Sequence, residues 1–185
     1  MMFRNILYFC QIRHHEPHRS HRVPGLTEIE RLHQLQQFQK AIVDRKCDGL
    51  ELRWTERKER TIFTTRNFSK HEFVVEYVGE LITFTQALKR ENEYVLARDE
   101  KGYMFYFRFQ EHKWCIDATA EDGTFGRLIN HSRRTLNLIP QIVPVNGVPH
   151  MVLKANRDIE SGEELAYDYG DRRTLVLKTY PWLSE

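Results

Sequence analysis

Polar side chains suited to ligand binding follow an apolar step in the second half of the chain. Residues 126–132 begin with glycine and end in Asn-His-Ser, directly after two apolar residues. The side chains of Asn130 and His131 can each donate and accept hydrogen bonds, so a turn built from them can be aimed at a polar ligand. The alternative is an ordinary turn with a buried, hydrogen-bonded histidine, and this stretch alone does not decide between the two.

A pair of tyrosines forms the second group that could do chemistry. Tyr167 and Tyr169 flank Asp168, just before Gly170. Residues two apart in a strand face the same side, so both rings suit one wall while Asp168 points to the other face. Flat aromatic walls can enclose methylene groups, attract a cation and place hydroxyls at a defined depth. Packing in a core is the alternative interpretation for tyrosines on a strand.

The composition favours a single domain that is rich in aromatic side chains and lies in a reducing compartment. A chain of 185 residues suits a single domain with an N-terminal extension. Lys and Arg total 28 against 26 for Asp and Glu, so net charge does not identify a polyanionic partner. Cys10, Cys47 and Cys115 are odd in number and far apart, which supports neither a disulfide framework nor a metal site and indicates a reducing compartment. The apolar run near the N-terminus is too short to span a bilayer, so no membrane partner is expected.

The binding residues must be positioned by elements that the hydrophobic pattern outlines. A capping box at Thr27 and Glu30 starts a helix that is expected to end near Asp44. A second helix is predicted from residue 83 or 85 to 96. Apolar positions of the first helix are Ile29, Leu32, Leu35, Phe38 and Ile42. In the second, Phe84, Leu88 and Val95 are expected to face inward and Lys89, Arg90 and Glu91 outward.

Short strands account for most of the remaining pattern. They are predicted at residues 50–54, 62–65, 73–78, 103–109, 113–117, 150–155 and 164–169. Residues 133–147 contain proline and are expected to form a long loop. Many short strands with few helices predict an α+β fold that is mainly β.

The chain divides into three parts in this interpretation. Residues 1–25 form an N-terminal extension and basic linker, 26–49 the flanking helix, and 50–185 the main domain. Between Arg13 and Arg22 there are three Arg and four His. The two interpretations of this linker are a metal- or phosphate-binding arm and a solvated tether, and the tether is favoured because the histidines share no helical face and have no cysteine partner. A weak contact with DNA is also expected.

Taken in order, several motifs resemble those of the SET-domain protein-lysine methyltransferases. They are residues 73–77, 126–132, 147–150, 155–159 and 162–171. Asn-His-Ser followed by Glu-Glu-Leu-Ala-Tyr-Asp-Tyr-Gly carries most of the likeness, and Tyr180-Pro-Trp-Leu resembles the branch that monomethylates lysine 20 of histone H4. The resemblance implies small curled sheets with a C-terminal pseudo-knot, in which the Asn-His step and the Tyr-Asp-Tyr segment lie against one another.

The resemblance also implies a reaction, a cofactor and partners. S-adenosylmethionine would donate one methyl group to a lysine amine, without a metal, and the partners would be the histone H4 tail and the nucleosome. A nuclear, chromatin-associated monomer is expected. By match to the family motifs, Tyr169 and Tyr167 are the catalytic tyrosines, and Tyr77 and Tyr94 line the lysine channel. The cofactor would be held by Lys58, Glu59, Arg60, Tyr103, Asn130, His131 and Trp182.

One loop departs from the family pattern. Where the family has a Gly-Lys-Gly-Arg-Gly type segment, Arg57, Glu59 and Thr61 replace the glycines around Lys58 and Arg60. A loop without glycine must take a more restricted path. Two alternatives to histone methylation therefore stand beside it: a chromatin-tail binding module with weakened catalysis, and a methyltransferase of a non-histone lysine.

Overall fold

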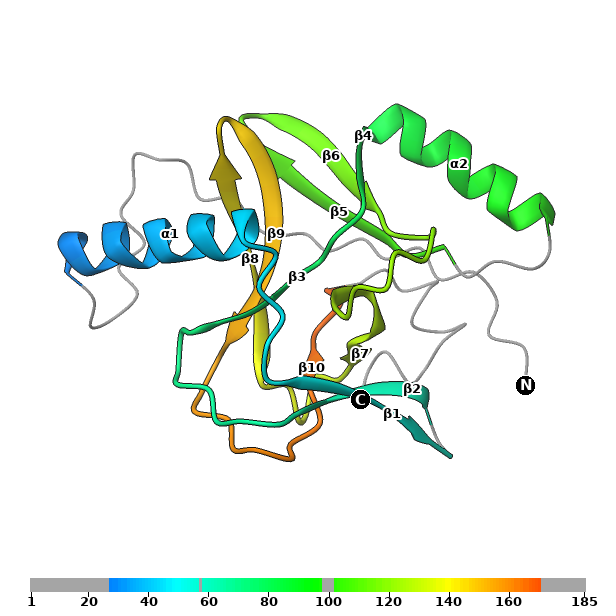
Figure 1. Ribbon diagram of the computed structural model, residues 1–185. Coiled ribbons are helices and arrows are strands. Elements are labelled where there is room, and N and C mark those ends of the chain that lie inside the picture. Colours follow the sequence, from blue (N-terminus) through cyan, green and yellow to red (C-terminus); the bar gives the residue numbers. More distant parts are fainter. Residues whose placement is uncertain (1–26, 57, 98–101, 171–185) are drawn as a thin grey trace.

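The strands form three small sheets, as expected for a mainly β, α+β fold (Figure 1). The structure is a computed structural model and describes residues 27–56, 58–97 and 102–170. Its helices are α1 (Glu28–Val43), α2 (Phe84–Ala97) and the 3-10 helix η1 (Gly126–Leu128). Its strands are β1 (Leu50–Thr55), β2 (Glu59–Thr64), β3 (Phe73–Glu76), β4 (Glu80–Thr83), β5 (Met104–Phe109), β6 (His112–Asp117), β7 (Asn130–His131), β8 (Leu138–Val145), β9 (Val148–Ala155) and β10 (Ala166–Tyr167).

The sheets are two-, five- and three-stranded. Their strand orders are β1-β2, β3-β9-β8-β10-β7 and β4-β6-β5. The largest core cluster joins all three sheets, with Ile62 from β2, Phe105 from β5 and Leu153 from β9 among its buried members. The N-terminal extension, including the linker between Arg13 and Arg22, lies outside the described residues. The predicted pseudo-knot involves the C-terminal segment, whose residues 171–185 also lie outside them.

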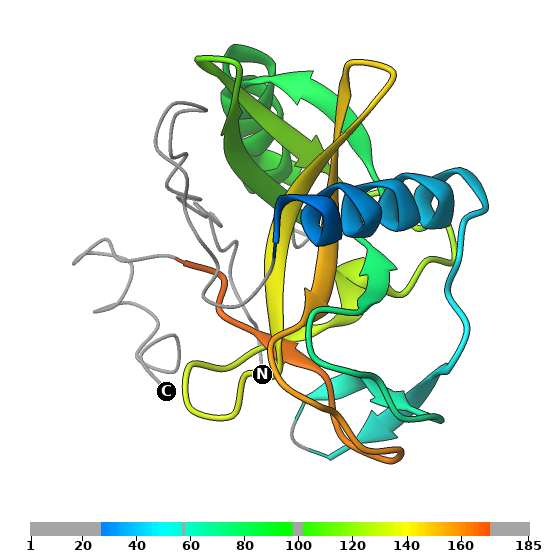
Figure 2. The same ribbon diagram turned by 90° about the vertical axis from the view of Figure 1, so that its left-hand side faces the viewer.

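Helix α1 begins as its sequence predicts. Thr27 and Glu30 form both hydrogen bonds of the capping box, and the helix ends at Val43. Phe38, Ala41 and Ile42 pack on residues of β3, β8 and β9, and α1 lies against β8 and β9 in both views (Figures 1 and 2). The expectation that Ile29 and Leu32 also face the core is wrong, since they are 75% and 53% exposed. The buried side chains all lie in the C-terminal half of α1, where it meets the sheet.

Helix α2 packs against the three-stranded sheet through Phe84, as expected, but Leu88 does not face inward. Ala87 is fully buried and Phe84 packs on Tyr106, whereas Leu88 is 43% exposed. Arg90, expected to point outward, reaches the buried Asp117 with its guanidinium group. The ion pair turns this charged residue inward, and a hydrophobic pattern cannot anticipate that.

The predicted long loop at residues 133–147 is mostly strand. Residues 138–145 form β8, which pairs with β9 along its whole length. Among the described residues, β8 pairs with its other neighbour, β10, only at Leu138. Pro140 and Pro144 are tolerated because a strand edge with so little pairing does not need their missing N–H groups. The two prolines therefore mark the edge of β8 that has little strand pairing in this part of the chain.

Strand β10 brings two distant motifs together. It is shorter than the predicted strand at 164–169 and runs parallel to both of its neighbours, with Ala166 opposite Asn130 and Tyr167 opposite His131 and Leu138. The expected contact between the Asn-His step and the Tyr-Asp-Tyr segment is confirmed.

Candidate active site

The Asn-His step and the Tyr-Asp-Tyr segment are joined by partly buried hydrogen bonds. The backbone N–H of Tyr169 donates to Nδ1 of His131 at 3.0 Å. Since Nδ1 accepts, the proton of the neutral imidazole lies on Nε2. The hydroxyl of Tyr169 donates to the carbonyl of Ile129 at 2.8 Å. The ring of Tyr169 lies 5.0 Å from that of His131 and 4.8 Å from that of Tyr167, so the three form one packed wall.

Asn137 fixes the strand that carries the tyrosines. It is 1% exposed, donates to the carbonyl of Glu164 at 2.9 Å and accepts from the N–H of Ala166 at 3.0 Å. A side-chain amide can satisfy both backbone groups because it donates and accepts at once. Asn137 thus holds the chain on either side of Leu165 and sets the position of Tyr167.

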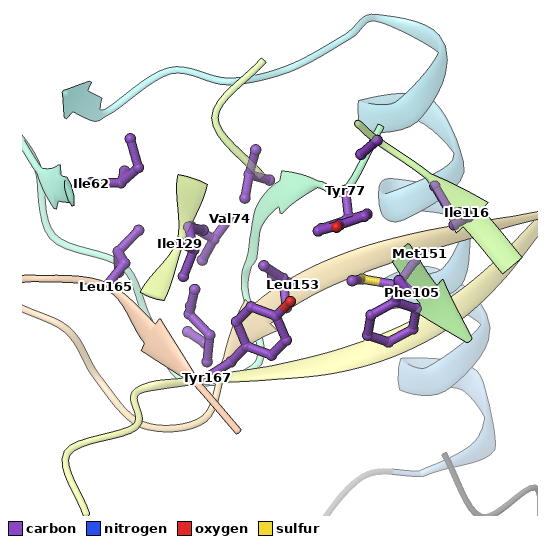
Figure 3. Packing of buried hydrophobic residues seen from close by; sticks show 14 of the residues in the cluster. Ile62, Val74, Tyr77, Phe105, Ile116, Ile129, Met151, Leu153, Leu165 and Tyr167 are labelled. Atoms are coloured by element: carbon purple, nitrogen blue, oxygen red, sulfur yellow. The ribbon is translucent and has the colours of Figure 1, made fainter. Parts of the chain in front are cut away.

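A pocket opens beside this wall. It encloses about 270 Å³ of empty space, its mouth included, and is lined by Tyr77, Tyr103, Met104, Phe105, Arg127, Tyr167 and Tyr169. Figure 3 shows Tyr77, Phe105 and Tyr167, which come from three separate segments, gathered around Met151 and Leu153 of β9. The lining is mainly aromatic and contains no carboxylate, histidine or lysine among the described residues.

Gly126 allows the pocket to close. A Cβ atom at this position would lie 2.3 Å from the carbonyl oxygen of Glu76 and 2.8 Å from Cα of Tyr77. Only glycine permits this approach of the η1 backbone to the end of β3. The contact places Tyr77 and Arg127 on the same pocket.

Arg127 is a functional candidate that the sequence did not single out. Its side chain is 4% exposed. The guanidinium carbon lies 4.0 Å from the centre of the Tyr103 ring, and Nη1 lies 3.5 Å from the Glu121 carboxylate. Nε and Nη1 are buried and have no hydrogen-bond partner among the described residues. Buried donors of a charged group are costly to leave unpaired, so an anionic group in the pocket would complete the site. Arg127 stands next to the apolar residues Leu128 and Ile129, so the sequence pattern gave no indication of a binding role for it.

The loop that lacks glycines keeps its basic residues near the site. Lys58 forms an ion pair with Glu164 at 2.6 Å, and Arg60 bonds Glu121. The hydrogen bond that Arg60 donates to Glu121 raises the pKa of Arg60, and the same contact lowers the pKa of Glu121. Both cations are therefore tied to carboxylates at the surface.

Two of the residues that replace the glycines, Glu59 and Thr61, differ in backbone conformation and in burial. Glu59 has a φ of 59°, in the left-handed region that glycine adopts readily. Thr61 is fully buried, and its hydroxyl lies 3.2 Å from that of Thr55 and accepts from Nδ2 of Asn130 at 3.3 Å. Arg57 lies outside the described residues. Thr61 thus fills space that a glycine would leave open and supports Asn130.

Most of the predicted site residues lie together. Tyr77, Tyr103, Tyr167 and Tyr169 line the pocket, Asn130 and His131 form the adjoining wall, and the loop with Lys58, Glu59 and Arg60 meets that wall at Asn130. Tyr94 does not line the pocket, because its hydroxyl donates to Asp117 and its ring packs in the cluster beneath α2. Trp182 lies outside the described residues.

Two other features, a metal-binding cluster and a membrane-spanning helix, are absent from the described part of the chain. It contains no cluster of three or more His, Cys, Asp or Glu side chains that could hold a metal ion. It also contains no helix that is long and apolar enough to cross a membrane.

Comparison with known families identifies the domain as a SET domain. The family model matches residues 59–170, which include the pocket, the Asn-His step and β10. The chain belongs to the SET domain family, as its motifs predicted.

Individual relatives agree with this assignment. The chain is 46% identical to histone-lysine N-methyltransferase Set8 of Drosophila melanogaster over 80% of its length, and 46% identical to N-lysine methyltransferase KMT5A of Xenopus tropicalis over 75%. It spans only 21% and 41% of those two proteins. A crystal structure of CpSET8 from Cryptosporidium matches with a TM-score of 0.71 and 32% identity, over 82% of this chain and 69% of that one.

Proposed function

We propose that this SET domain transfers one methyl group from S-adenosylmethionine to a histone lysine, namely lysine 20 of histone H4. The observation that carries the proposal is the aromatic pocket in which the Tyr169 hydroxyl is fixed by the Ile129 carbonyl beside Tyr167. A narrow aromatic channel suits the methylenes of a lysine side chain. The names of the relatives from fly and frog support the reaction class.

The residues beside the pocket fit S-adenosylmethionine. Arg127 offers buried N–H groups to a carboxylate, and Asn130 and His131 are polar groups suited to its amino-acid and adenine parts. Lys58, Glu59, Arg60, Tyr103 and Trp182 complete the proposed cofactor set. When bound, the cofactor supplies an electrophilic methyl group on a sulfonium sulfur.

Tyr169 is proposed to orient the reacting groups. Its hydroxyl donates to the Ile129 carbonyl, which fixes the direction in which the tyrosine oxygen can face the positive charge that develops on the methyl group. The lysine nitrogen uses its lone pair to form the N–C bond while the C–S bond breaks and its electron pair stays on sulfur. The pocket lining offers no carboxylate or imidazole among the described residues, so the lysine proton passes to water.

Tyr167 is proposed to set the number of methyl groups. Its ring lies 4.8 Å from that of Tyr169, on the same wall. A hydroxyl at this place, with the water it holds, occupies the space that a second methyl group would need. Tyr77, at the opposite side of the pocket, encloses the lysine methylenes together with Phe105.

The proposed partners follow from the substrate. The domain would act in the nucleus on the H4 tail within nucleosomes, as a monomer. The linker between Arg13 and Arg22 would add a weak, salt-sensitive contact with DNA.

The test is methyl transfer to defined histone substrates. The protein is incubated with labelled S-adenosylmethionine and nucleosomes, and then with an H4 tail peptide and the same peptide in which lysine 20 is replaced by arginine. Label on histone H4 and on the first peptide only is the expected result. Transfer to no histone or peptide would contradict the reaction, and transfer to a different lysine would contradict the substrate. Calorimetry with S-adenosylhomocysteine measures cofactor binding independently of turnover.

A further inference from the structure

A charge cluster built around one buried carboxylate lies next to the pocket but outside it. Asp117, the last residue of β6, has a side chain that is 3% exposed. Its Oδ2 accepts from Nη1 of Arg90 at 2.9 Å and from the hydroxyl of Tyr94 at 2.8 Å. Arg90 also forms a two-bond contact with Glu80, at 2.7 and 2.9 Å. Apolar side chains in such a place often stabilise a fold as well as buried charges do, so stability alone gives no reason for this cluster.

The cluster is connected to the pocket through the segment that follows Asp117. Oδ1 of Asp117 accepts from the N–H of Thr119 at 3.0 Å, and the Thr119 hydroxyl accepts from the N–H of Tyr103 at 3.1 Å. The N–H of Ala118 donates to the carbonyl of Tyr103 at 2.8 Å. Both backbone polar groups of Tyr103 are therefore held by residues 118 and 119. The ring of Tyr103 in turn packs on the guanidinium group of Arg127.

The backbone of Asp117 is also fixed on the side of β3 and β4. A Cβ atom on Gly79 would lie 2.6 Å from the carbonyl oxygen of Asp117, so the two backbones are in direct contact. Burial acts to raise the pKa of Asp117, but hydrogen bonds from Thr119 and Arg90 outweigh it and hold the pKa below its usual value. The carboxylate is thus charged, and the backbone of Asp117 lies between Gly79, two residues after Tyr77, and the segment that holds Tyr103.

We propose that Arg90, Tyr94 and Asp117 are positioning residues that hold Tyr103, and through it Arg127, in the geometry that binds the cofactor. This inference rests on the proposed function. None of the three lines the pocket. It gives Tyr94, which the motifs assign to the lysine channel, an indirect role through Asp117.

The main test compares two tyrosines of the cluster beneath α2, the partly buried Tyr94 and the buried Tyr106. Tyr94→Phe removes the hydroxyl that bonds Asp117. Tyr106→Phe removes a hydroxyl that interacts with Glu91 instead, and so serves as the matched control. Tyr94→Phe is expected to weaken binding of S-adenosylhomocysteine, and to raise KM for the cofactor, about tenfold, because hydrogen bonds to charged groups are the strong ones. We expect kcat to change less than about threefold, since Tyr169 and Tyr167 are untouched.

A second readout does not depend on catalysis. Hydrogen exchange at the amides of Tyr103 and Ala118, measured without cofactor, is expected to accelerate in Tyr94→Phe and to stay unchanged in Tyr106→Phe. Arg90→Lys, which keeps a positive charge near Asp117, should bind cofactor more tightly than Arg90→Met.

The outcomes separate the two proposals. Unchanged cofactor affinity and unchanged exchange at Tyr103 in Tyr94→Phe would overturn the positioning role. So would equal losses in Tyr94→Phe and Tyr106→Phe that follow a lower Tm, because they would indicate a structural role alone. If the unaltered protein neither binds S-adenosylhomocysteine nor transfers methyl groups, the proposed function fails, and the exchange rates still decide whether the cluster holds Tyr103.

Discussion

Two sides of the candidate site are built in opposite ways. The wall formed by β7 and β10 is made of parallel strand pairing, a buried histidine and the side-chain bonds of Asn137. The loop at residues 58–61 is held at the surface by the ion pairs of Lys58 and Arg60, whose side chains are 39% and 31% exposed. The wall is fixed by the buried side chains of His131 and Asn137, whereas the loop is fixed by charged side chains that are in contact with water.

This difference in burial predicts which residues of the site tolerate substitution and which do not. Buried hydrogen bonds leave an unsatisfied partner when one member is removed, so the wall has few acceptable substitutes. Exposed ion pairs contribute about 0–1 kcal/mol, so the loop can lose its glycines and still bring basic residues to the site. Variants on the wall should therefore affect chemistry strongly, and variants on the loop should affect affinity or stability weakly.

The largest effect is expected for Tyr169→Phe. The substitution keeps the ring but removes the oxygen that faces the reacting methyl group, so kcat should fall about 100- to 1,000-fold. The lost bond to the Ile129 carbonyl should cost about 1 kcal/mol of unfolding free energy. Single-turnover methyl transfer and urea denaturation measure the two effects. A kcat within tenfold of the unaltered protein would remove Tyr169 from the catalytic role.

A large effect on cofactor affinity is expected for Arg127→Met. Loss of a buried charged group that meets an anionic partner typically costs about 2 kcal/mol or more, which corresponds to roughly 30-fold in affinity. Lys58→Met, on the exposed loop, should weaken binding by no more than about fivefold, and less at high salt. Calorimetry with S-adenosylhomocysteine at two salt concentrations makes the comparison. Equal losses in the two variants would erase the contrast between buried and exposed cations.

Tyr167→Phe is expected to change the product more than the rate. Without the hydroxyl, the pocket has room for a lysine that already carries a methyl group, so dimethyllysine should accumulate while kcat for the first transfer changes less than about tenfold. Mass spectrometry of the H4 peptide over a time course gives the ratio. If the ratio of mono- to dimethyl product does not change, Tyr167 does not control the degree of methylation.

The smallest effect, and one of opposite sign, is expected for Glu59→Gly. A left-handed φ is unfavourable for glutamate, so glycine should raise the free energy of unfolding by about 0.5–1 kcal/mol, after its greater entropy in the unfolded chain is counted. Glu56→Gly, in the same loop but without a positive φ, should lower it instead. Chemical denaturation of both variants provides the test, and a destabilised Glu59→Gly would mean that Glu59 makes contacts worth more than its strain.

The sequence predicts the wall of the site better than the surroundings of the pocket. Asn130, His131, Tyr167 and Tyr169 belong to contiguous motifs with a clear family likeness, and their proximity follows from it. The capping box of Thr27 and Glu30 is equally local, and it was predicted to the residue.

Features that depend on distant partners were missed for physical reasons. Arg90 lies on the face of α2 that a hydrophobic pattern assigns to solvent, and only the position of Asp117 turns it inward. Pro140 and Pro144 suggested a loop, because the sequence cannot show that β8 has an open edge. Arg127 was missed for the same reason, because the pocket that its side chain lines is assembled from four separate segments.

The parallel placement of β10 between β7 and β8 has a consequence for how the protein matures. The strand that completes the pocket is the last of the ten in the described residues, and the preceding turn also bonds β2, about 100 residues earlier, through Thr64 and Ile62. Such distant pairings form late and slowly, and refolding is expected on the order of milliseconds to seconds. A nascent chain that has not yet released residues 160–170 from the ribosome can build α1 and the β5–β6 hairpin, yet the wall formed by β7 and β10 is missing. The pocket is thus complete only after this segment has left the ribosome and paired with strands made much earlier.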